Sequence, residues 1–282
     1  MTLLGEIAPL RAVLDRPHGL VEGPRIGPAG EAVYSDVIAG GVWSCSLEGV
    51  VRELLPKRRG IGGIVAHADG GWVVSGRSVL HLQSNGEQRE LLSDEDVRGY
   101  NDLGVSPRGG LLAGELRYAP LAGEQPVPGR LVELLPSGEL VVLSEDVVWP
   151  NGIGVSPDGA TVYVSDYSRG AVLAVRADGS REGEDFCSSP QGSCDGLALD
   201  VEGGVWVALG EGGGVARFRS DGTLDGVVDL PASFVSSISF GGEDMCDVLI
   251  STADNESNPE LGGTLLRARS SVAGLPLVPV EV

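Results

Sequence analysis

A sixfold internal repeat is the sequence feature that most constrains the fold of this chain. Each copy has a small or polar first residue, a short apolar strand, a turn containing glycine and a second apolar strand. Aligned on their first residues, the copies begin at Glu22, Gly62, Asn101, Asn151, Asp195 and Ser237, at intervals of 39 to 50 residues. A four-stranded blade of a β-propeller needs about 40 to 50 residues. The repeat therefore predicts an all-β fold, a six-bladed β-propeller with four-stranded antiparallel blades, formed as one domain by residues 1–282.

The segments between the copies supply the outer two strands of each blade. Residues 78–92, 130–144 and 214–230 each contain two alternating strands around an SNG, PSG or SDG turn, which is the chemistry of hairpins. We find no convincing apolar period of 3.6 residues, so helix should be scarce. The apolar stretch from Ile7 to Leu14 is expected to complete the last blade and so close the ring. A β-sandwich and a seven-bladed ring are the alternatives.

Charge and cysteine usage limit the partners and the compartment. The net charge of −20 disfavours nucleic acids and anionic membranes and favours cations. The N-terminus lacks a basic segment followed by a long apolar run, and the four cysteines form neither a CxxC pair nor a zinc spacing. We expect a cytoplasmic protein, monomeric or weakly homo-oligomeric, that acts on a small molecule. A Cys187–Cys194 disulfide is the less favoured alternative to free thiols.

The first residue of each copy should point toward the axis of the propeller, and four of the six carry oxygen ligands. These four are Glu22, Asn101, Asn151 and Asp195. Converging carboxylates repel one another unless a cation lies among them, and hard oxygen ligands suit Ca²⁺, Mg²⁺ or Mn²⁺. Asn-Gly and Asp-Gly are also ordinary turn sequences. The common phase of these residues within the repeat, rather than any single dipeptide, predicts a site for one divalent cation.

Four motifs in order resemble those of the senescence-marker-protein/gluconolactonase/luciferin-regenerating-enzyme family. They are LVEGPRIGPAGEAVYSDV, RGYNDLGVSPRGGLLAG, WPNGIGVSPDGATVYVSD and CDGLALDVEGGVWVAL, and they extend over residues 20–209. Members of that family are six-bladed propellers with one metal ion at the mouth of the channel. They include lactone hydrolases and, more distantly, organophosphate-cleaving enzymes. The resemblance implies metal ligands at Glu22, Asn151 and Asp195. It also implies a substrate contact at Asn101, which Asp102 follows as in the family's Asn-Asp pair.

Departures from the family pattern affect the expected substrate rather than the expected metal site. Gly99 replaces an arginine that often reaches for sugar hydroxyls, and the neighbouring Arg98 should point to the opposite face of its strand. Ile26 replaces a common tryptophan, and Cys194 replaces a proline. We therefore expect weaker activity on gluconolactone than on a less polar lactone, unless another arginine, such as Arg25 or Arg117, enters the channel.

Several other residues are candidates for parts of the site. His18 could line the mouth and bind substrate, although a role in a surface loop is the favoured reading. Trp149 and Tyr167 flank the Asn151 motif, where lining the pocket and packing at the rim are equal alternatives. Cys194 is adjacent to a metal-ligand candidate, but a buried structural thiol is favoured over a nucleophile. With only two further histidines, in a turn and an outer strand, a Ser-His-Asp triad has little support.

The sequence, together with the resemblance, predicts a metal-dependent hydrolase of a lactone or related cyclic ester. Asp195 is the first candidate for the catalytic base, Asp102 is the second, and Asn101 would orient the substrate. Ca²⁺ is the favoured cofactor, with Mg²⁺, Mn²⁺ or Zn²⁺ as alternatives. The competing functions are a phosphotriesterase-like or aryl-ester hydrolase on the same metal, and a non-catalytic ligand-binding propeller with a structural metal.

Overall fold

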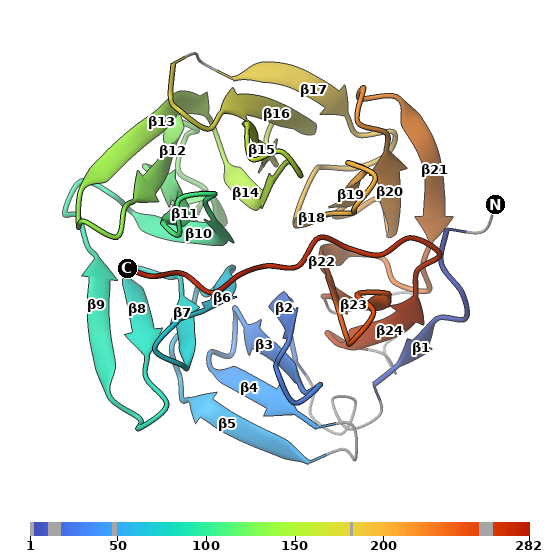
Figure 1. Ribbon diagram of the computed structural model, residues 1–282, viewed down its shortest axis with the longest axis horizontal. Coiled ribbons are helices and arrows are strands. Elements are labelled where there is room, and N and C mark those ends of the chain that lie inside the picture. Colours follow the sequence, from blue (N-terminus) through green and yellow to red (C-terminus); the bar gives the residue numbers. More distant parts are fainter. Residues whose placement is uncertain (1–2, 11–17, 47–49, 181–182, 254–261) are drawn as a thin grey trace.

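Six four-stranded antiparallel sheets stand as blades in a ring, as Figure 1 shows. The computed structural model describes residues 3–10, 18–46, 50–180, 183–253 and 262–282. Among these residues no helix is long and apolar enough to cross a membrane, and the described helical element is a 3₁₀ turn, η1 (Pro120–Ala122). The predicted all-β, six-bladed propeller is therefore confirmed.

Each blade is a meander in which consecutive strands pair, except that the last blade borrows a strand from the N-terminus. Blade 1 contains β2 (Val21–Ile26), β3 (Ala32–Asp36), β4 (Val42–Cys45) and β5 (Val51–Leu55). Blade 2 contains β6 (Ile64–Ala66), β7 (Trp72–Val74), β8 (Val79–Leu82) and β9 (Gln88–Leu92). Blade 3 contains β10 (Gly99–Val105), β11 (Leu111–Leu116), β12 (Gly129–Leu134) and β13 (Leu140–Val147).

The second half of the ring follows the same order. Blade 4 contains β14 (Pro150–Val155), β15 (Thr161–Asp166), β16 (Ala171–Arg176) and β17 (Glu184–Ser188). Blade 5 contains β18 (Leu197–Leu199), β19 (Val205–Ala208), β20 (Gly214–Phe218) and β21 (Leu224–Asp229). Blade 6 contains β22 (Val235–Gly241), β23 (Asp247–Thr252), β24 (Leu265–Arg269) and β1 (Ala8–Pro9). The inner strands β2, β6, β10, β14, β18 and β22 surround the axis of the ring.

The turn that joins the first two strands of blade 4 has the chemistry that the sequence predicts. In blade 4, the Gly159 amide donates to the Ser156 carbonyl at 2.8 Å, and the Asp158 carboxylate accepts from the Ala160 amide at 3.0 Å. Gly159 has a φ of 72°, a left-handed conformation that glycine adopts without steric cost. The VSPDG segment is therefore a turn, and the polar residues that begin the copy lie at the other end of β14.

The hydrophobic core of the described residues is divided among the junctions between neighbouring blades. One cluster joins Leu92 of blade 2 to Leu103 of blade 3, and another joins Leu112 of blade 3 to Val164 of blade 4. Similar clusters fill the other four junctions, including the one between blades 6 and 1. Since both faces of each blade are buried in this way, apolar burial holds the blades together in a ring.

The N-terminal strand closes the ring, as predicted. Within blade 6, Ala8 is paired with Arg267 and Pro9 with Leu266, so β1 covers the outer edge of β24. The Gly5 amide adds a hydrogen bond of 2.8 Å to the Arg269 carbonyl. Residues 11–14 of the predicted stretch lie outside the described residues. The covered edge leaves β24 unable to pair with another chain.

The last twelve residues, 271–282, form a C-terminal strap across one end of the ring (Figure 1). The Leu275 amide donates to the Leu199 carbonyl at 2.8 Å, and the Val280 amide donates to the Ala66 carbonyl at 2.9 Å. Leu199 and Ala66 are the last residues of their inner strands. The strap therefore lies across the end of the ring where the inner strands finish. The opposite end, where they begin, is called the mouth below.

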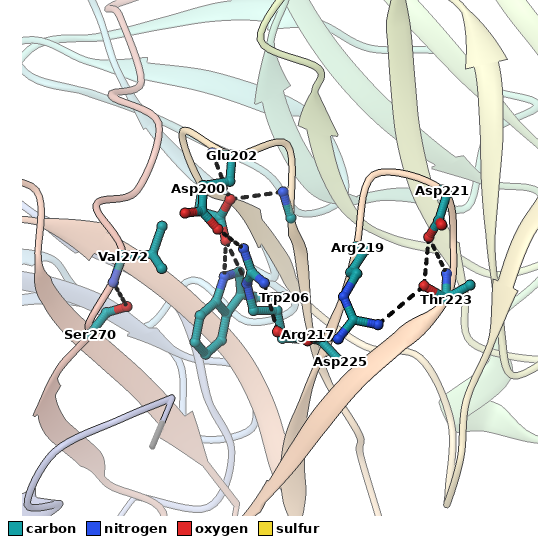
Figure 2. A network of polar contacts seen from close by, with 11 residues as sticks. Asp200, Glu202, Trp206, Arg217, Arg219, Asp221, Thr223, Asp225, Ser270 and Val272 are labelled. Carbon is teal, nitrogen blue, oxygen red and sulfur yellow. Dashed lines mark hydrogen bonds and ion pairs between the residues drawn. The ribbon is translucent and has the colours of Figure 1, made fainter. Parts of the chain in front are cut away.

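A buried ion-pair network stabilises blade 5, as Figure 2 shows. Arg217 of β20 contacts Asp200 at 2.8 Å, Asp225 at 2.7 Å and Glu202 at 2.8 Å. The Trp206 indole nitrogen also donates to Asp200, at 2.8 Å. Because Asp200 is fully buried, these donors compensate a carboxylate that would otherwise be costly to remove from water.

Candidate functional site

Irregular strand pairing places the polar residues at the mouth. The ladder between the first two strands of a blade shifts register between Glu22 and Arg25 and between Pro150 and Ile153. It also shifts between Tyr100 and Leu103 in blade 3. A bulge bends its strand and changes the direction of its side chains. Each of these three shifts coincides with the polar residues that begin a copy of the repeat.

Asp195 reaches the same region by a different route. It precedes β18, and its amide donates to the Ala208 carbonyl at 2.9 Å. The next amide, that of Gly196, donates across the blade junction to the Ser236 carbonyl at 2.8 Å. The Gly152 amide of blade 4 donates to the Asp195 carbonyl at 3.2 Å. The backbone at Asp195 is therefore fixed between blades 4, 5 and 6.

Three buried carboxyl groups, Glu22, Asp102 and Asp195, share this end of the ring. Burial raises the pKa of Glu22 well above its usual range, and the charges of Asp195 and Asp102 raise it further. Burial, followed by the charges of Asp102 and Glu211, likewise raises the pKa of Asp195. Burial raises the pKa of Asp102 to about 6 against the opposing effect of Arg25. The ionised carboxylates destabilise one another, and a cation placed among them would remove this repulsion.

The two asparagines lie beside these carboxyl groups. The Asn151 side chain lies beside the Asp195 carboxylate and lowers its pKa against the effect of burial. The Asn101 amide nitrogen donates to the Pro150 carbonyl at 3.0 Å, and a Cβ atom at Gly62 would lie 2.7 Å from its Oδ1. The first residues of neighbouring copies therefore face one another around the mouth.

The donor set fits a hard cation. Asp195 Oδ1 is buried without a hydrogen-bond partner, so an oxygen lone pair is free. Across the described ranges, no three His, Cys, Asp or Glu side chains lie close enough together to hold a metal ion by themselves. A cation here would therefore use the carboxylates of Glu22 and Asp195 with the side-chain oxygen of Asn151. Such an all-oxygen set suits Ca²⁺ or Mg²⁺.

Arg25 is a charged neighbour of this site that was not among the predicted site residues. Its positive charge acts on the carboxylates of Asp102 and Glu22. Burial lowers the pKa of the Arg25 guanidinium, and the two carboxylates oppose this effect only in part. Its Nη1 donates to the Pro24 carbonyl at 2.8 Å, and its Nε is buried without a hydrogen-bond partner. The sequence showed only that Arg25 was one of two arginines that could enter the channel.

Trp149 and Tyr167 form an aromatic pair beside Asn151. Their ring centroids are 4.6 Å apart, and the Tyr167 amide donates to the Trp149 carbonyl at 3.0 Å. Burial, followed by the charges of Asp195 and Glu211, raises the pKa of the Tyr167 hydroxyl, which donates to Glu211 at 3.1 Å. Both rings are half-buried. An aromatic surface therefore lies next to the candidate cation ligands.

His18 is bound into blade 1. Its Nδ1 is hydrogen-bonded to the Asp36 carboxylate at 3.0 Å, and its Nε2 to the Tyr34 hydroxyl at 3.4 Å. The imidazole is buried and packs edge-on against the Tyr34 ring. Both ring nitrogens thus have partners within the blade, and substrate binding by His18 stays a prediction.

Cys194 and Arg98 lie where the sequence interpretation placed them. Cys194 is fully buried in the junction between blades 4 and 5 as a free thiol, and burial raises its pKa to about 12. Cys187 is a free thiol in the same cluster, so the alternative disulfide is absent. Arg98 is exposed and pairs with Glu124 at 3.2 Å. Arg98 therefore does not replace the arginine missing at Gly99.

Residues 20–254 match the model of the family described as the SMP-30/Gluconolactonase/LRE-like region. The chain belongs to this family. A 6-deoxy-6-sulfogluconolactonase of Pseudomonas putida is 30% identical over 285 residues, which cover 94% of this family member and 96% of the relative. A pentonolactonase of Haloferax volcanii is 29% identical over 284 residues, which cover 94% and 95% of the two chains.

Solved structures show the same fold at lower identity. A luciferin-regenerating enzyme superposes with a TM-score of 0.85 at 19% identity and covers 98% of this family member and 99% of its own chain. A regucalcin from Agrobacterium tumefaciens, described as a calcium-binding protein, gives a TM-score of 0.83 at 22% identity, with 96% of each chain covered. These likenesses extend the family fold over nearly the whole chain.

Proposed function

We propose that this family member is a divalent-cation-dependent hydrolase of a lactone or related cyclic ester. The observation that carries the proposal is the pair of buried carboxylates, Glu22 and Asp195, beside the Asn151 amide, with one Asp195 oxygen free of any hydrogen bond. Relatives named as lactonases support the reaction class. The regucalcin described as calcium-binding supports Ca²⁺ as the first candidate.

Each side chain at the mouth has a different role in the proposed reaction. When bound, the cation would supply Lewis-acid polarisation of the ester carbonyl. Asn101 would orient the substrate through its amide group, which Pro150 already holds in place. Asp195 would accept the proton of the attacking water, with Asp102, the neighbouring buried carboxyl group, as the alternative base.

The surroundings of the site favour a substrate of moderate polarity. Trp149 and Tyr167 offer an aromatic surface for a ring or a short alkyl substituent. Gly99 supplies no cation for sugar hydroxyls, and Arg98 is engaged with Glu124 at the surface. We propose that an alkyl-substituted γ-lactone is hydrolysed with a higher kcat/KM than gluconolactone. A strong preference for gluconolactone would contradict this assignment.

Cation titration and hydrolysis assays on chelated protein test the site. Added Ca²⁺, Mg²⁺, Mn²⁺ or Zn²⁺ should restore lactone hydrolysis. Glu22→Gln, Asn151→Ala and Asp195→Ala should each weaken cation binding by about tenfold or more. Asp221→Asn, which changes an exposed turn carboxylate in blade 5, is the matched control and should bind normally.

Unchanged cation stoichiometry and affinity in all three variants would place the cation elsewhere. If the cation-loaded protein does not hydrolyse lactones, the proposed substrate class is wrong. Cleavage of aryl esters or phosphotriesters would then identify the substrate class, and no cleavage of any of these would indicate a binding function.

The identity of the base can be tested separately from cation binding. At saturating cation, Asp195→Asn should lower kcat by about a hundredfold or more, as loss of a general base does. Asp102→Asn should keep most of the rate. If Asp102→Asn instead loses the rate while its cation affinity is retained, the base is Asp102.

A further inference from the structure

The end of the ring opposite the mouth contains a cavity. Its volume is about 310 Å³, and it lies between the C-terminal ends of the inner strands and the C-terminal strap. The strap contributes Leu275, Pro276, Leu277 and Val278 to its lining. Functional small-molecule pockets begin at about this size. The cavity is therefore large enough for a small organic ligand.

Most of the lining is apolar. Ile153 and Leu197 are buried side chains on neighbouring inner strands, and Leu199 and Ile238 continue the same surface. Phe240 adds an aromatic ring. Such a surface favours an alkyl chain over a sugar, since burial of apolar area contributes about 25 cal/mol per Å². The ligand should therefore have an apolar body.

Two polar atoms in the lining have no hydrogen-bond partner within the described structure. Arg25 Nε is buried without an acceptor, although the same guanidinium donates from Nη1 to the Pro24 carbonyl. Ser239 is 4% exposed, and its Oγ also lacks a partner. A buried donor without an acceptor destabilises a protein by about 1–3 kcal/mol. A ligand that accepts hydrogen bonds from both groups would remove that cost.

We propose that this cavity binds a small monocarboxylate with a short alkyl chain. The carboxylate would accept charge-assisted hydrogen bonds from Arg25 and a hydrogen bond from the Ser239 hydroxyl. The alkyl chain would pack between Ile153, Leu199 and Phe240. The site is distinct from the proposed cation site, because its lining lies mainly where the inner strands end and includes none of Glu22, Asn151 and Asp195. Arg25 lies between the two sites, since its charge also acts on Glu22 and Asp102.

Calorimetry with hexanoate tests the proposal directly. The titrations use full-length protein both after chelation and with saturating Ca²⁺, so that binding to a cation at the mouth is recognised. We expect saturable binding in both forms. Hexanol and hexylammonium, which keep the chain but lack the carboxylate, should bind weakly or not at all. Hexanoate binding that disappears on chelation, or no saturable binding of hexanoate at all, would overturn the proposal.

Variants locate the bound carboxylate. Arg25→Gln should weaken hexanoate by about ten- to hundredfold, the effect of losing a hydrogen bond to a charged group. Arg25→Lys should retain part of the affinity, and Ser239→Ala should weaken binding less than Arg25→Gln. Asn151→Ala, at the mouth, is the matched control and should bind hexanoate normally. Equal affinity in wild type and Arg25→Gln would contradict the assignment.

A measurement on the wild-type protein avoids any dependence on the folding of these variants. Hexanoate should shift the amide NMR signals of Leu199, Phe240 and Leu275. Signals from Asn151 and Asp195 should move little. The opposite pattern would place the ligand at the mouth and refute a separate site.

Discussion

Asp195 combines two opposing requirements in one side chain. Without a cation, its buried negative charge is disfavoured by desolvation and by the charges of Asp102 and Glu211. With a cation bound, the same carboxylate would be a ligand, and its unpartnered Oδ1 could coordinate the cation. Sites shaped for function often reduce stability in the absence of their ligand. A substitution that keeps the shape of the Asp195 side chain and removes its charge should separate its effect on stability from its effect on cation binding.

Asp195→Asn should therefore have opposite effects in the two forms of the protein. In chelated protein at neutral pH, it should raise the free energy of unfolding by about 1–2 kcal/mol, because a buried charge is removed. Added Ca²⁺ should raise the melting temperature of the wild type but not of the variant. Thermal melts with and without Ca²⁺ check both signs. If Ca²⁺ stabilises the variant as much as the wild type, Asp195 is not a ligand.

The phase of the repeat predicts which residues share one end of the ring. Glu22, Asn101, Asn151 and Asp195 were singled out by their common phase, and the structure places them at the same end; their roles in binding and catalysis stay predictions. Arg25 could not be assigned, because the irregular pairing between Glu22 and Arg25 changes which way its side chain points. The partners of His18 were also beyond sequence reasoning, since Asp36 and Tyr34 belong to a neighbouring strand.

At the scale of single elements, two arginines in and just after β20 lie in very different surroundings. The Arg217 side chain is 7% exposed and is bound by Asp200, Glu202 and Asp225 (Figure 2). Just beyond β20, the Arg219 side chain is 53% exposed and pairs with Asp225 as well. Buried and exposed ion pairs differ greatly in their effect on stability. The two residues therefore form an internal comparison.

Arg217→Met should destabilise the protein by about 3–5 kcal/mol, because it leaves the fully buried Asp200 carboxylate without its cationic partner. Arg219→Met should cost less than about 1 kcal/mol. Chemical denaturation of both variants provides the measurement. Similar losses of stability in the two variants would mean that the ion pairs of Arg217 contribute no more than an exposed ion pair does.

The N-terminal strand β1 should contribute more to the stability of the ring than its length of two residues suggests. Deleting residues 1–10 should expose the outer edge of β24 and the adjoining apolar surface. We expect a lower melting temperature and concentration-dependent association, measured by calorimetry and light scattering. A truncated protein that melts at the wild-type temperature and stays monodisperse would show that closure does not depend on β1.

For the whole molecule, the spacing of the repeat was sufficient to predict the number of blades and the closure of the ring. Each copy encodes the same local pattern, so errors at single strands do not change the count. The strap at residues 271–282 could not be predicted, because its path depends on hydrogen bonds to distant backbone atoms of Leu199 and Ala66. Long-range pairing of this kind leaves no periodic signal in the sequence.

Because Cys194 is buried, the reactivity of its thiol can report how often the junction between blades 4 and 5 opens. A thiol reagent reacts with the thiolate, and this thiol is both fully buried and raised in pKa to about 12. Since it lies in the junction of blades 4 and 5, its modification requires those blades to separate. The partly exposed Cys246 should react at once and provides the reference.

In a variant that keeps Cys194 as its single cysteine, labelling should be slow, and bound Ca²⁺ should slow it further by holding Asp195. A rate equal to that of a second variant, which keeps only Cys246, would mean that the junction opens freely. The labelling half-time would thus measure how often the ring comes apart beside its own candidate catalytic centre.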